Sequence, residues 1–202
     1  MILYAESNLL LEVALAQEQA EAARGLIALA ETGKVRLIVP ILALVEPIWT
    51  LTRKHQERLD LWNRLDADIR QLGRSAHSQD VARSLMTGIQ GVRDTAPEED
   101  RLYDELLVRL VGVAEFANLD TGVLLGSDAV RDVYGLGRLD ALMLTSILVH
   151  LQAASPDEEK LFVSRDKKAF ERPDILARLG THRCTYVSSF DAAFQRLQSA
   201  QA

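Results

Sequence analysis

The stretch MILYAESNLLLEV, residues 1–13, begins with an apolar run that stops at Glu6, and apolar residues resume after Ser7 and Asn8. The first run, ILYA, has the length and composition of a short buried strand. The second run has apolar residues at helical spacing, and either Ser7 or Asn8 can cap its first turn. The stretch therefore predicts a strand that passes directly into a helix, with an acid and an amide at the junction.

The same change from strand to helix recurs along the chain. The segments VRLIVP (35–40), KLFVS (160–164) and CTYVS (184–188) are predicted strands, and each is followed by residues with helical spacing. Strands separated by helices predict a parallel sheet with helices on both faces. We therefore expect an α/β fold, an α/β/α sandwich around a central, mostly parallel sheet.

The spacing of apolar residues also places the helices. It predicts helix over 9–31, one or two helices over 41–70, and two helices separated by YGLG over 118–152. The second helix of that last pair is apolar almost all round and is expected to be buried. Residues 55–117 contain no strand candidate, so we expect a helical insertion or lid there, within a single domain spanning 1–202.

The composition is that of an ordinary globular domain, with 48% hydrophobic and 26% charged residues. No apolar run is long enough to span a membrane, and MILYAES lacks the basic start of a secretory signal, so we expect a cytoplasmic protein. Cys184 is the only cysteine, which excludes an internal disulfide and a cysteine-based zinc site. The net charge of −6 would repel nucleic acid, so a phosphate-bearing substrate would need metal ions or a local basic patch.

Four acids follow or interrupt these predicted elements. Glu6 follows the first strand and Asp166 follows LFVS, which places both at the carboxyl edge of a parallel sheet, where binding sites form. Glu46 lies in the apolar stretch PILALVEPIW, and Asp140 opens the most buried helix in GLGRLDALMLTSIL. Acids are rarely buried unless they are paired or bound to a metal ion.

Each acid also has a simpler interpretation. Glu6 could be exposed at the strand end, Asp140 and Asp166 could cap helices, and Glu46 could pair with Arg53. Their recurrence after successive elements favours one shared site. Two carboxylates about 4 Å apart would repel by about 4 kcal/mol at an effective dielectric of about 20, and a divalent cation would remove that cost. An all-oxygen ligand set suits Mg²⁺ or Mn²⁺ rather than Zn²⁺.

Four short motifs, in this order, resemble the PIN-domain nucleases: YAESN, LALVEPIW, GLGRLDALMLTSIL and LFVSRDKKAF. They are similar to the family's strand followed by Asp-x-Asn, its Glu in the second helix, its Asp-Ala opening a buried helix, and its strand followed by Thr/Ser-x-Asp. The resemblance covers residues 1–54 and 118–190. It has one departure, because Glu6 stands where the family has Asp. A shift of about 1 Å at a reacting centre can cost about 100-fold in rate.

The resemblance implies a metal-dependent endoribonuclease that hydrolyses phosphodiester bonds of single-stranded RNA with Mg²⁺ or Mn²⁺. The acids implied as catalytic residues and metal ligands are Glu6, Glu46, Asp140 and Asp166. Asn8 and Ser164 would support them by holding a carboxylate or a water molecule in place.

Four basic residues lie beside these acids in the sequence: Arg138, Arg165, Lys167 and Lys168. They are predicted to contact the RNA backbone, with a solvated helix end as the alternative interpretation. The resemblance also suggests a toxin of a toxin–antitoxin pair, with a small antitoxin as partner, and a homodimer. The competing hypothesis is a degenerate PIN-like module that binds RNA or protein without cutting, for which Glu6 would be the sign.

Overall fold

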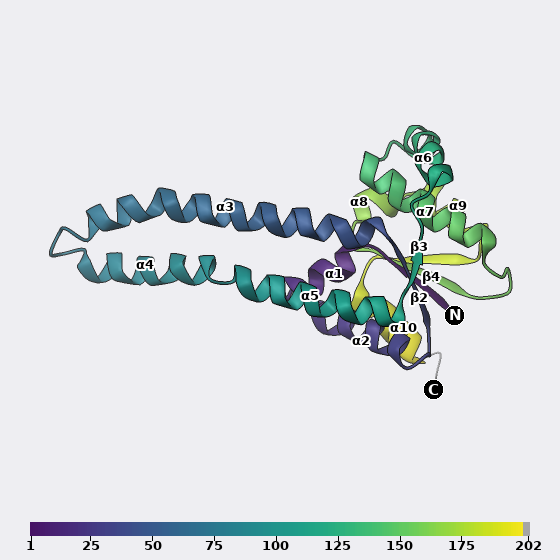
Figure 1. Cartoon of the computed structure of the whole chain (residues 1–202), viewed down its shortest axis with the longest axis horizontal. Helices are drawn as coiled ribbons and strands as arrows, with labels where there is room; N and C mark the ends of the chain where they lie inside the picture. Colours follow the sequence, from purple (N-terminus) through teal and green to yellow (C-terminus); the bar gives the residue numbers. More distant parts are fainter. Residues whose placement is uncertain (200–202) are drawn as a thin grey trace.

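The computed structural model describes residues 1–199, which fold around a five-stranded sheet of order β3-β2-β1-β4-β5 (Figure 1). Each pair of neighbouring strands runs parallel. This confirms the predicted α/β fold; residues 200–202 of the predicted domain lie outside the described residues. The strands are β1 (Ile2–Ala5), β2 (Arg36–Pro40), β3 (Glu115–Ala117), β4 (Lys160–Val163) and β5 (Cys184–Val187).

Helices cover both faces of the sheet because the buried side chains of each strand alternate between two apolar clusters. Along β1, Leu3 and Ala5 join one cluster, and Ile2 and Tyr4 join the other. The helices of the first cluster are α1 (Ser7–Ala14), α2 (Ala20–Glu31), α5 (Ala96–Val113) and α10 (Phe190–Ser199). The helices of the second are α7 (Arg138–Ala153), α8 (Lys167–Phe170) and α9 (Pro173–Gly180), and α6 (Thr121–Tyr134) packs on α7.

Several predicted helix boundaries are confirmed by local chemistry. Asp120 caps α6 by accepting a hydrogen bond from the backbone N–H of Val123 at 2.9 Å. Gly135 ends α6 with a left-handed φ of 58°, which explains why YGLG separates two helices. The second helix of the pair, α7, buries half of its residues, as its apolar sequence predicts.

Two predictions from the sequence are wrong. The helix expected over 9–31 is divided into α1 and α2 by a turn in which Ala16 has a φ of 47°. Helical spacing continues across this turn because both helices face the same cluster. The stretch 55–117, expected to lack a strand, ends in β3, which has three residues and, among the described strands, pairs with β2 alone.

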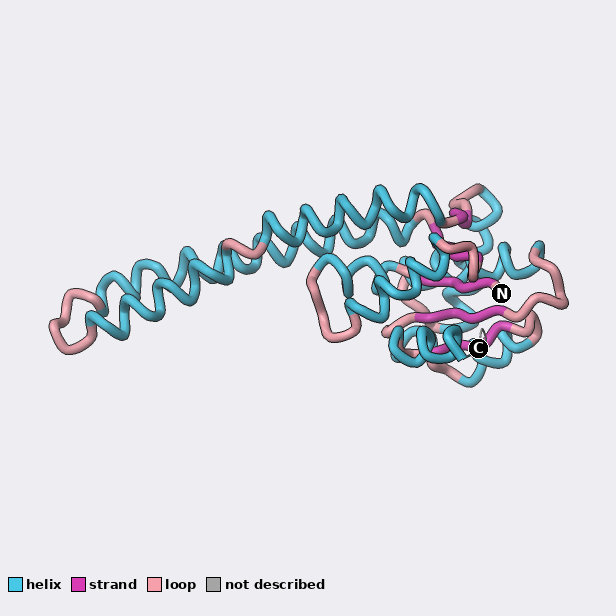
Figure 2. The backbone as a smooth tube through the Cα atoms, turned by 90° about the horizontal axis from the view of Figure 1, so that it is seen from below, coloured by secondary structure: helices cyan, strands magenta, loops and turns pink. Residues whose placement is uncertain are grey.

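A two-helix arm projects from the α/β body (Figures 1 and 2). It forms because α3 (Leu42–Leu72) has 31 residues, a length of about 46 Å, and α4 (Gln79–Arg93) folds back along it. We call residues 53–93 the arm. At its base, Arg58 donates to Glu99 at 2.7 Å, and the Arg93 guanidinium lies 5.1 Å from the centre of the Trp62 ring.

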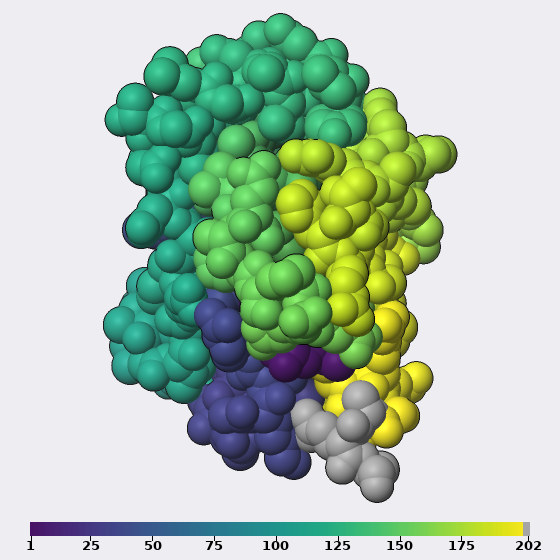
Figure 3. Space-filling model, turned by 90° about the vertical axis from the view of Figure 1, so that its right-hand side faces the viewer, coloured from purple at the N-terminus to yellow at the C-terminus, as the bar shows by residue number. Residues whose placement is uncertain are grey.

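The carboxyl ends of the strands point toward the arm. At the opposite end of the body, the amino group of Met1 pairs with Glu158 at 3.3 Å. Figure 3 views that end, where the first residues form a small purple patch between blue and green segments. Since Pro40 of β2 leads directly into α3, the helix that continues into the arm begins at the carboxyl edge of the sheet.

The Phe162→Ala variant should lose about 3–5 kcal/mol of stability. Phe162 is fully buried in β4, and its ring makes edge contacts with Phe170 and Tyr186. Urea unfolding followed by circular dichroism measures the loss. The control, Val108→Ala, changes a side chain that is 74% exposed and should stay within about 0.5 kcal/mol of wild type. Equal losses in both variants would contradict this assignment of the core.

Candidate active site

The strand order changes direction between β1 and β4. From β1 the chain adds β2 and β3 on one side, and it later adds β4 and β5 on the other side. The carboxyl edge at such a switch point forms the crevice in which ligands bind in open parallel sheets. Glu6 leaves β1 at this edge, and Ser164 and Asp166 leave β4 beside it.

The Glu6 carboxylate is buried at this edge, with 4% of the residue exposed. It caps α1 by accepting from the backbone N–H of Asn8 at 3.0 Å, and the Asn8 side-chain amide donates to it at 2.6 Å. Ser164 also hydrogen-bonds to it from the end of β4. The structure therefore brings Asn8 and Ser164, two residues singled out in the sequence, onto the first of the four acids.

Ser7 joins Glu6 to a second predicted acid, Glu46 of α3. Its hydroxyl oxygen lies 2.7 Å from a carboxylate oxygen of Glu6 and 2.7 Å from one of Glu46. A hydroxyl has one proton, so it can donate to only one of two ionised carboxylates. Burial raises the pKa of Glu6, against the opposing effect of hydrogen bonds from Ser7 and Asn8. If Glu6 is protonated, its carboxyl group can donate to the Ser7 hydroxyl oxygen. The Ser7 hydroxyl can then donate its own proton to Glu46, so both contacts become hydrogen bonds.

The sequence indicates Ser7 only as a possible helix cap. The signal that could have identified it is its position: a hydroxyl directly after an acid at the end of a buried strand. Its contact with Glu46, 39 residues away, depends on how α3 packs against α1.

The other two predicted acids lie near Glu46. Asp140 is in the first turn of α7 and is half-buried. Burial raises its pKa above the ordinary value, the charges of Asp166 and then Glu46 raise it further, and a hydrogen bond from the backbone of Gly137 opposes them. At the carboxyl edge, the carboxylates of Asp166 and Glu46 therefore repel that of Asp140.

Asp166 has structural contacts as well. It caps α8 by accepting from the backbone N–H of Ala169 at 2.9 Å, and its own backbone N–H donates to the Ser164 hydroxyl at 2.9 Å. The capping role that the sequence offered as an alternative for Asp166 is thus present in the structure. It leaves the second carboxylate oxygen of Asp166 without a capping contact.

A pocket of about 380 Å³ opens beside two of the acids. Asp140 and Asp166 line it together with the basic residues Lys168 and Arg172. Lys168 is one of the four basic residues predicted to contact RNA, whereas Arg172 was not predicted. Arg172 donates to the backbone carbonyl of Tyr134, which holds its guanidinium at the pocket.

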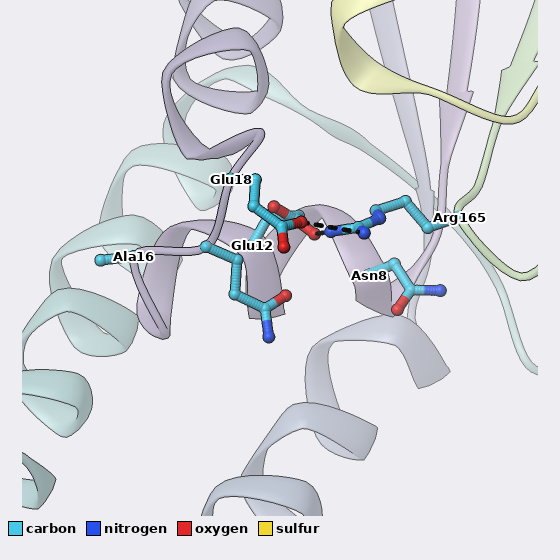
Figure 4. Close-up of a pocket in the computed structure, with 6 residues that line it drawn as sticks. Asn8, Glu12, Ala16, Glu18 and Arg165 are labelled. Atoms are coloured by element: carbon cyan, nitrogen blue, oxygen red, sulfur yellow. Dashed lines mark hydrogen bonds and ion pairs between the residues drawn. The ribbon is translucent and has the colours of Figure 1, made fainter. Parts of the chain in front are cut away.

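The remaining predicted basic residues differ in their surroundings. Arg138 and Lys167 are exposed. Arg165 instead forms ion pairs with Glu12, which is buried, and with Glu18 at 3.1 Å (Figure 4). A contact between Arg165 and RNA would have to compete with these two carboxylates.

The donor chemistry of the site fits a hard divalent cation, because Asp166 and Glu46 repel Asp140 and none of these three carboxylates forms an ion pair in the part of the chain that the structure describes. The spacing is wider than one ion requires. Within residues 1–199, no three His, Cys, Asp or Glu side chains are grouped closely enough to hold a metal ion as they stand. Binding would therefore require side-chain rotation, which the partial exposure of Glu46, Asp140 and Asp166 allows.

Comparisons of the chain with protein-family models, with curated proteins and with solved structures give no match. Among the helices of residues 1–199, none combines the length and the apolar character needed to cross a membrane.

The Asp140→Asn variant should be more stable than wild type near neutral pH when metal is removed with EDTA. Because the pKa of Asp140 is raised in the folded chain, the folded state binds this proton more tightly than the unfolded state. Stability is therefore lost as pH rises through the ordinary value of 3.8 toward the raised value, and Asn avoids that loss. We expect a midpoint of thermal unfolding about 2 °C higher.

This difference should shrink as pH falls below 3.8, where both states of the wild type are protonated. Asp104→Asn, a change of an exposed acid on α5, serves as the control and should show no such pH-dependent gain. A destabilised Asp140→Asn variant near neutral pH would contradict the repulsion among these acids.

The Arg165→Ala variant should lose about 1–3 kcal/mol of stability, because it leaves the buried Glu12 carboxylate without its charged partner. The double variant Arg165→Met, Glu12→Gln should recover part of the loss, since it removes the unpaired charge. Urea unfolding measures both. An Arg165→Ala variant as stable as wild type would show that the ion pair does not hold this part of the site together.

Proposed function

We propose that the chain is a metal-dependent endoribonuclease of the PIN-domain type, which hydrolyses phosphodiester bonds of single-stranded RNA. One observation carries the proposal: at the switch point of the sheet, burial and then the charges of Asp166 and Glu46 raise the pKa of Asp140. Carboxylates that repel one another at this edge are costly to keep unless a cation binds there.

Glu46, Asp140 and Asp166 are the residues that would hold Mg²⁺ or Mn²⁺. A bound ion would polarise the scissile phosphate and lower the pKa of the attacking water. Glu6 would act through its neighbours, because its carboxylate is buried and Ser7 links it to Glu46. In this role Glu6 and Ser7 orient the Glu46 carboxylate.

The basic residues around the pocket support a phosphate-bearing substrate. Lys168 and Arg172 line the pocket with Asp140 and Asp166, so they are placed to bind a phosphate next to the acids. Arg138 and Lys167 are exposed at the first turns of α7 and α8. These local charges would offset the overall net charge of −6 near the site.

A second candidate function is a PIN-like module that binds RNA or protein without cutting it. It is favoured by Glu6, whose hydrogen bonds with Asn8, Ser7 and Ser164 make it a buried structural group. It is also favoured by the absence, within residues 1–199, of a group of acids already spaced for a metal ion.

Purified wild type should cleave single-stranded RNA oligonucleotides in Mg²⁺ or Mn²⁺ and stop in EDTA. Asp140→Asn should cleave about 100-fold more slowly or not at all, because it weakens metal binding and changes the charge beside the phosphate. Gel analysis of labelled RNA measures cleavage. Titration calorimetry with Mn²⁺ gives an independent readout, in which the variant should bind more weakly.

Asp104→Asn should cleave and bind Mn²⁺ as wild type does, since it lies outside the site. Cleavage that survives Asp140→Asn unchanged would refute the assignment. A wild type that neither cleaves RNA nor binds Mn²⁺ would favour the second candidate. In that case, if Glu6→Asp gained both RNA cleavage and Mn²⁺ binding, the result would show that Glu6 prevents activity in the wild type.

A further inference from the structure

A second pocket opens at the amino edge of the sheet, at the end of the body that Figure 3 views. Its volume is about 270 Å³, and it lies where α7 ends and where β4 and β5 begin. Among the described residues, no Asp or Glu lines it. We call it the amino-edge pocket. Its polar lining consists of Gln152, Lys160, Thr181, His182 and Arg183.

Lys160 is a buried cation with an unused donor. It is 1% exposed, and its ammonium donates to the backbone carbonyls of Ser155 at 2.6 Å and Glu158 at 2.8 Å. An ammonium has three N–H groups, so one of them has no acceptor in the described part of the chain. Lysine is almost never fully buried unless its charge is paired. Lys160 therefore indicates an anion at this pocket.

Within residues 1–199, the chain offers Lys160 no counter-charge. The Cys184 thiol lies opposite it on β5, and burial raises the pKa of that thiol to about 12, so the thiol is neutral near pH 7. The carboxylates of Glu158 and Glu159 pair with other basic groups, at 3.3 Å and 2.7 Å. The carboxyl ends of α7 and α9 carry only partial negative charge. The counter-charge must therefore come from outside the chain.

His182 brings a second unused polar atom to the same pocket. Its Nε2 atom is buried and has no hydrogen-bond partner among the described residues. Burial lowers the pKa of His182, and the charges of Arg178 and Lys160 lower it further, so the ring is neutral near pH 7. A neutral imidazole with its proton on Nε2 is a donor at that atom. Since buried polar atoms are nearly always hydrogen-bonded, this donor indicates an acceptor in the pocket.

Arg183 adds a loosely held guanidinium at the rim. Its side chain is 64% exposed, and it contacts the carbonyl oxygen of Pro156 at 3.4 Å and the Asp157 carboxylate at 4.0 Å. Its backbone φ of 55° is left-handed, which is uncommon for a residue with a side chain. Because these contacts are long, the guanidinium is free to turn toward a ligand in the pocket.

We propose that the amino-edge pocket binds a phosphate-type oxyanion, either inorganic phosphate or the phosphate group of a small phosphorylated molecule. Lys160, His182 and Arg183 donate to its oxygens. Phosphate suits three such donors better than a carboxylate does, because it offers at least three acceptor oxygens and nearly two negative charges. The volume is below the range of about 300–1,000 Å³ that is typical for drug-sized ligands, which favours a small anion. The site does not depend on the proposed nuclease activity.

The test is thermal unfolding of the full chain in EDTA, with phosphate replacing chloride at constant pH and ionic strength. The midpoint of wild type should rise by about 2 °C or more, because a ligand that binds only the folded state stabilises it. His182→Leu should bind inorganic phosphate about 10-fold more weakly or worse, since it removes a donor to a charged group. Titration calorimetry with inorganic phosphate measures the affinities.

Arg183→Asn is a second variant, which should weaken binding by about 10-fold. It should fold, because asparagine tolerates the left-handed conformation at this position. Lys34→Gln is the matched control, since it removes an exposed positive charge at the same edge of the sheet but outside the pocket. It should bind phosphate as wild type does. Lys168→Gln, which changes the pocket beside Asp140 and Asp166, should also keep the stabilisation.

A ribonucleoside 5′-monophosphate, compared with its unphosphorylated nucleoside, separates the two sources of phosphate. Binding of the monophosphate alone identifies a phosphorylated molecule, and binding of inorganic phosphate alone identifies the free ion. In both cases His182→Leu must weaken it. Equal stabilisation of wild type and His182→Leu would show a general salt effect and overturn the proposal. Stabilisation that is lost in Lys168→Gln but kept in His182→Leu would overturn it as well, as would a wild type that binds neither ligand.

Discussion

At the carboxyl end of β1 the carboxylate of Glu6 is buried, and a buried carboxylate is stable only when donors or a proton satisfy it. The donors come from three places: Asn8 at the start of α1, Ser7 beside it, and Ser164 at the end of β4. Through Ser7 the same cluster reaches Glu46 on α3. The elements that meet at this edge are therefore positioned by the need to satisfy one acid.

The other three acids at this edge differ from Glu6 in their surroundings. Glu46, Asp140 and Asp166 come from separate elements and are partly exposed, and none of the three forms an ion pair within residues 1–199. Arg165, which adjoins Asp166 in the sequence, is instead paired with Glu12 and Glu18. The basic residues at the pocket are Lys168 and Arg172, and Arg172 also pairs with Asp174 at 3.1 Å. Basic residues beside these acids are consistent with a site for a cation and a phosphate together.

The helix α3 connects this edge to the arm. It carries Glu46 in its first turns and continues into the arm, and its 31 residues form one continuous element.

The sequence by itself determined the strands β1, β2, β4 and β5 and the break at Gly135, because apolar runs, helical spacing and a left-handed glycine are local signals. It also determined the four acids, since acids that interrupt apolar segments stand out without a structure. Only the tertiary structure decided β3, the contact of Ser7 with Glu46 and the pairing of Arg165 with Glu12. Each of these depends on which distant segment lies opposite, and a residue's own neighbours in the sequence hold no information on that.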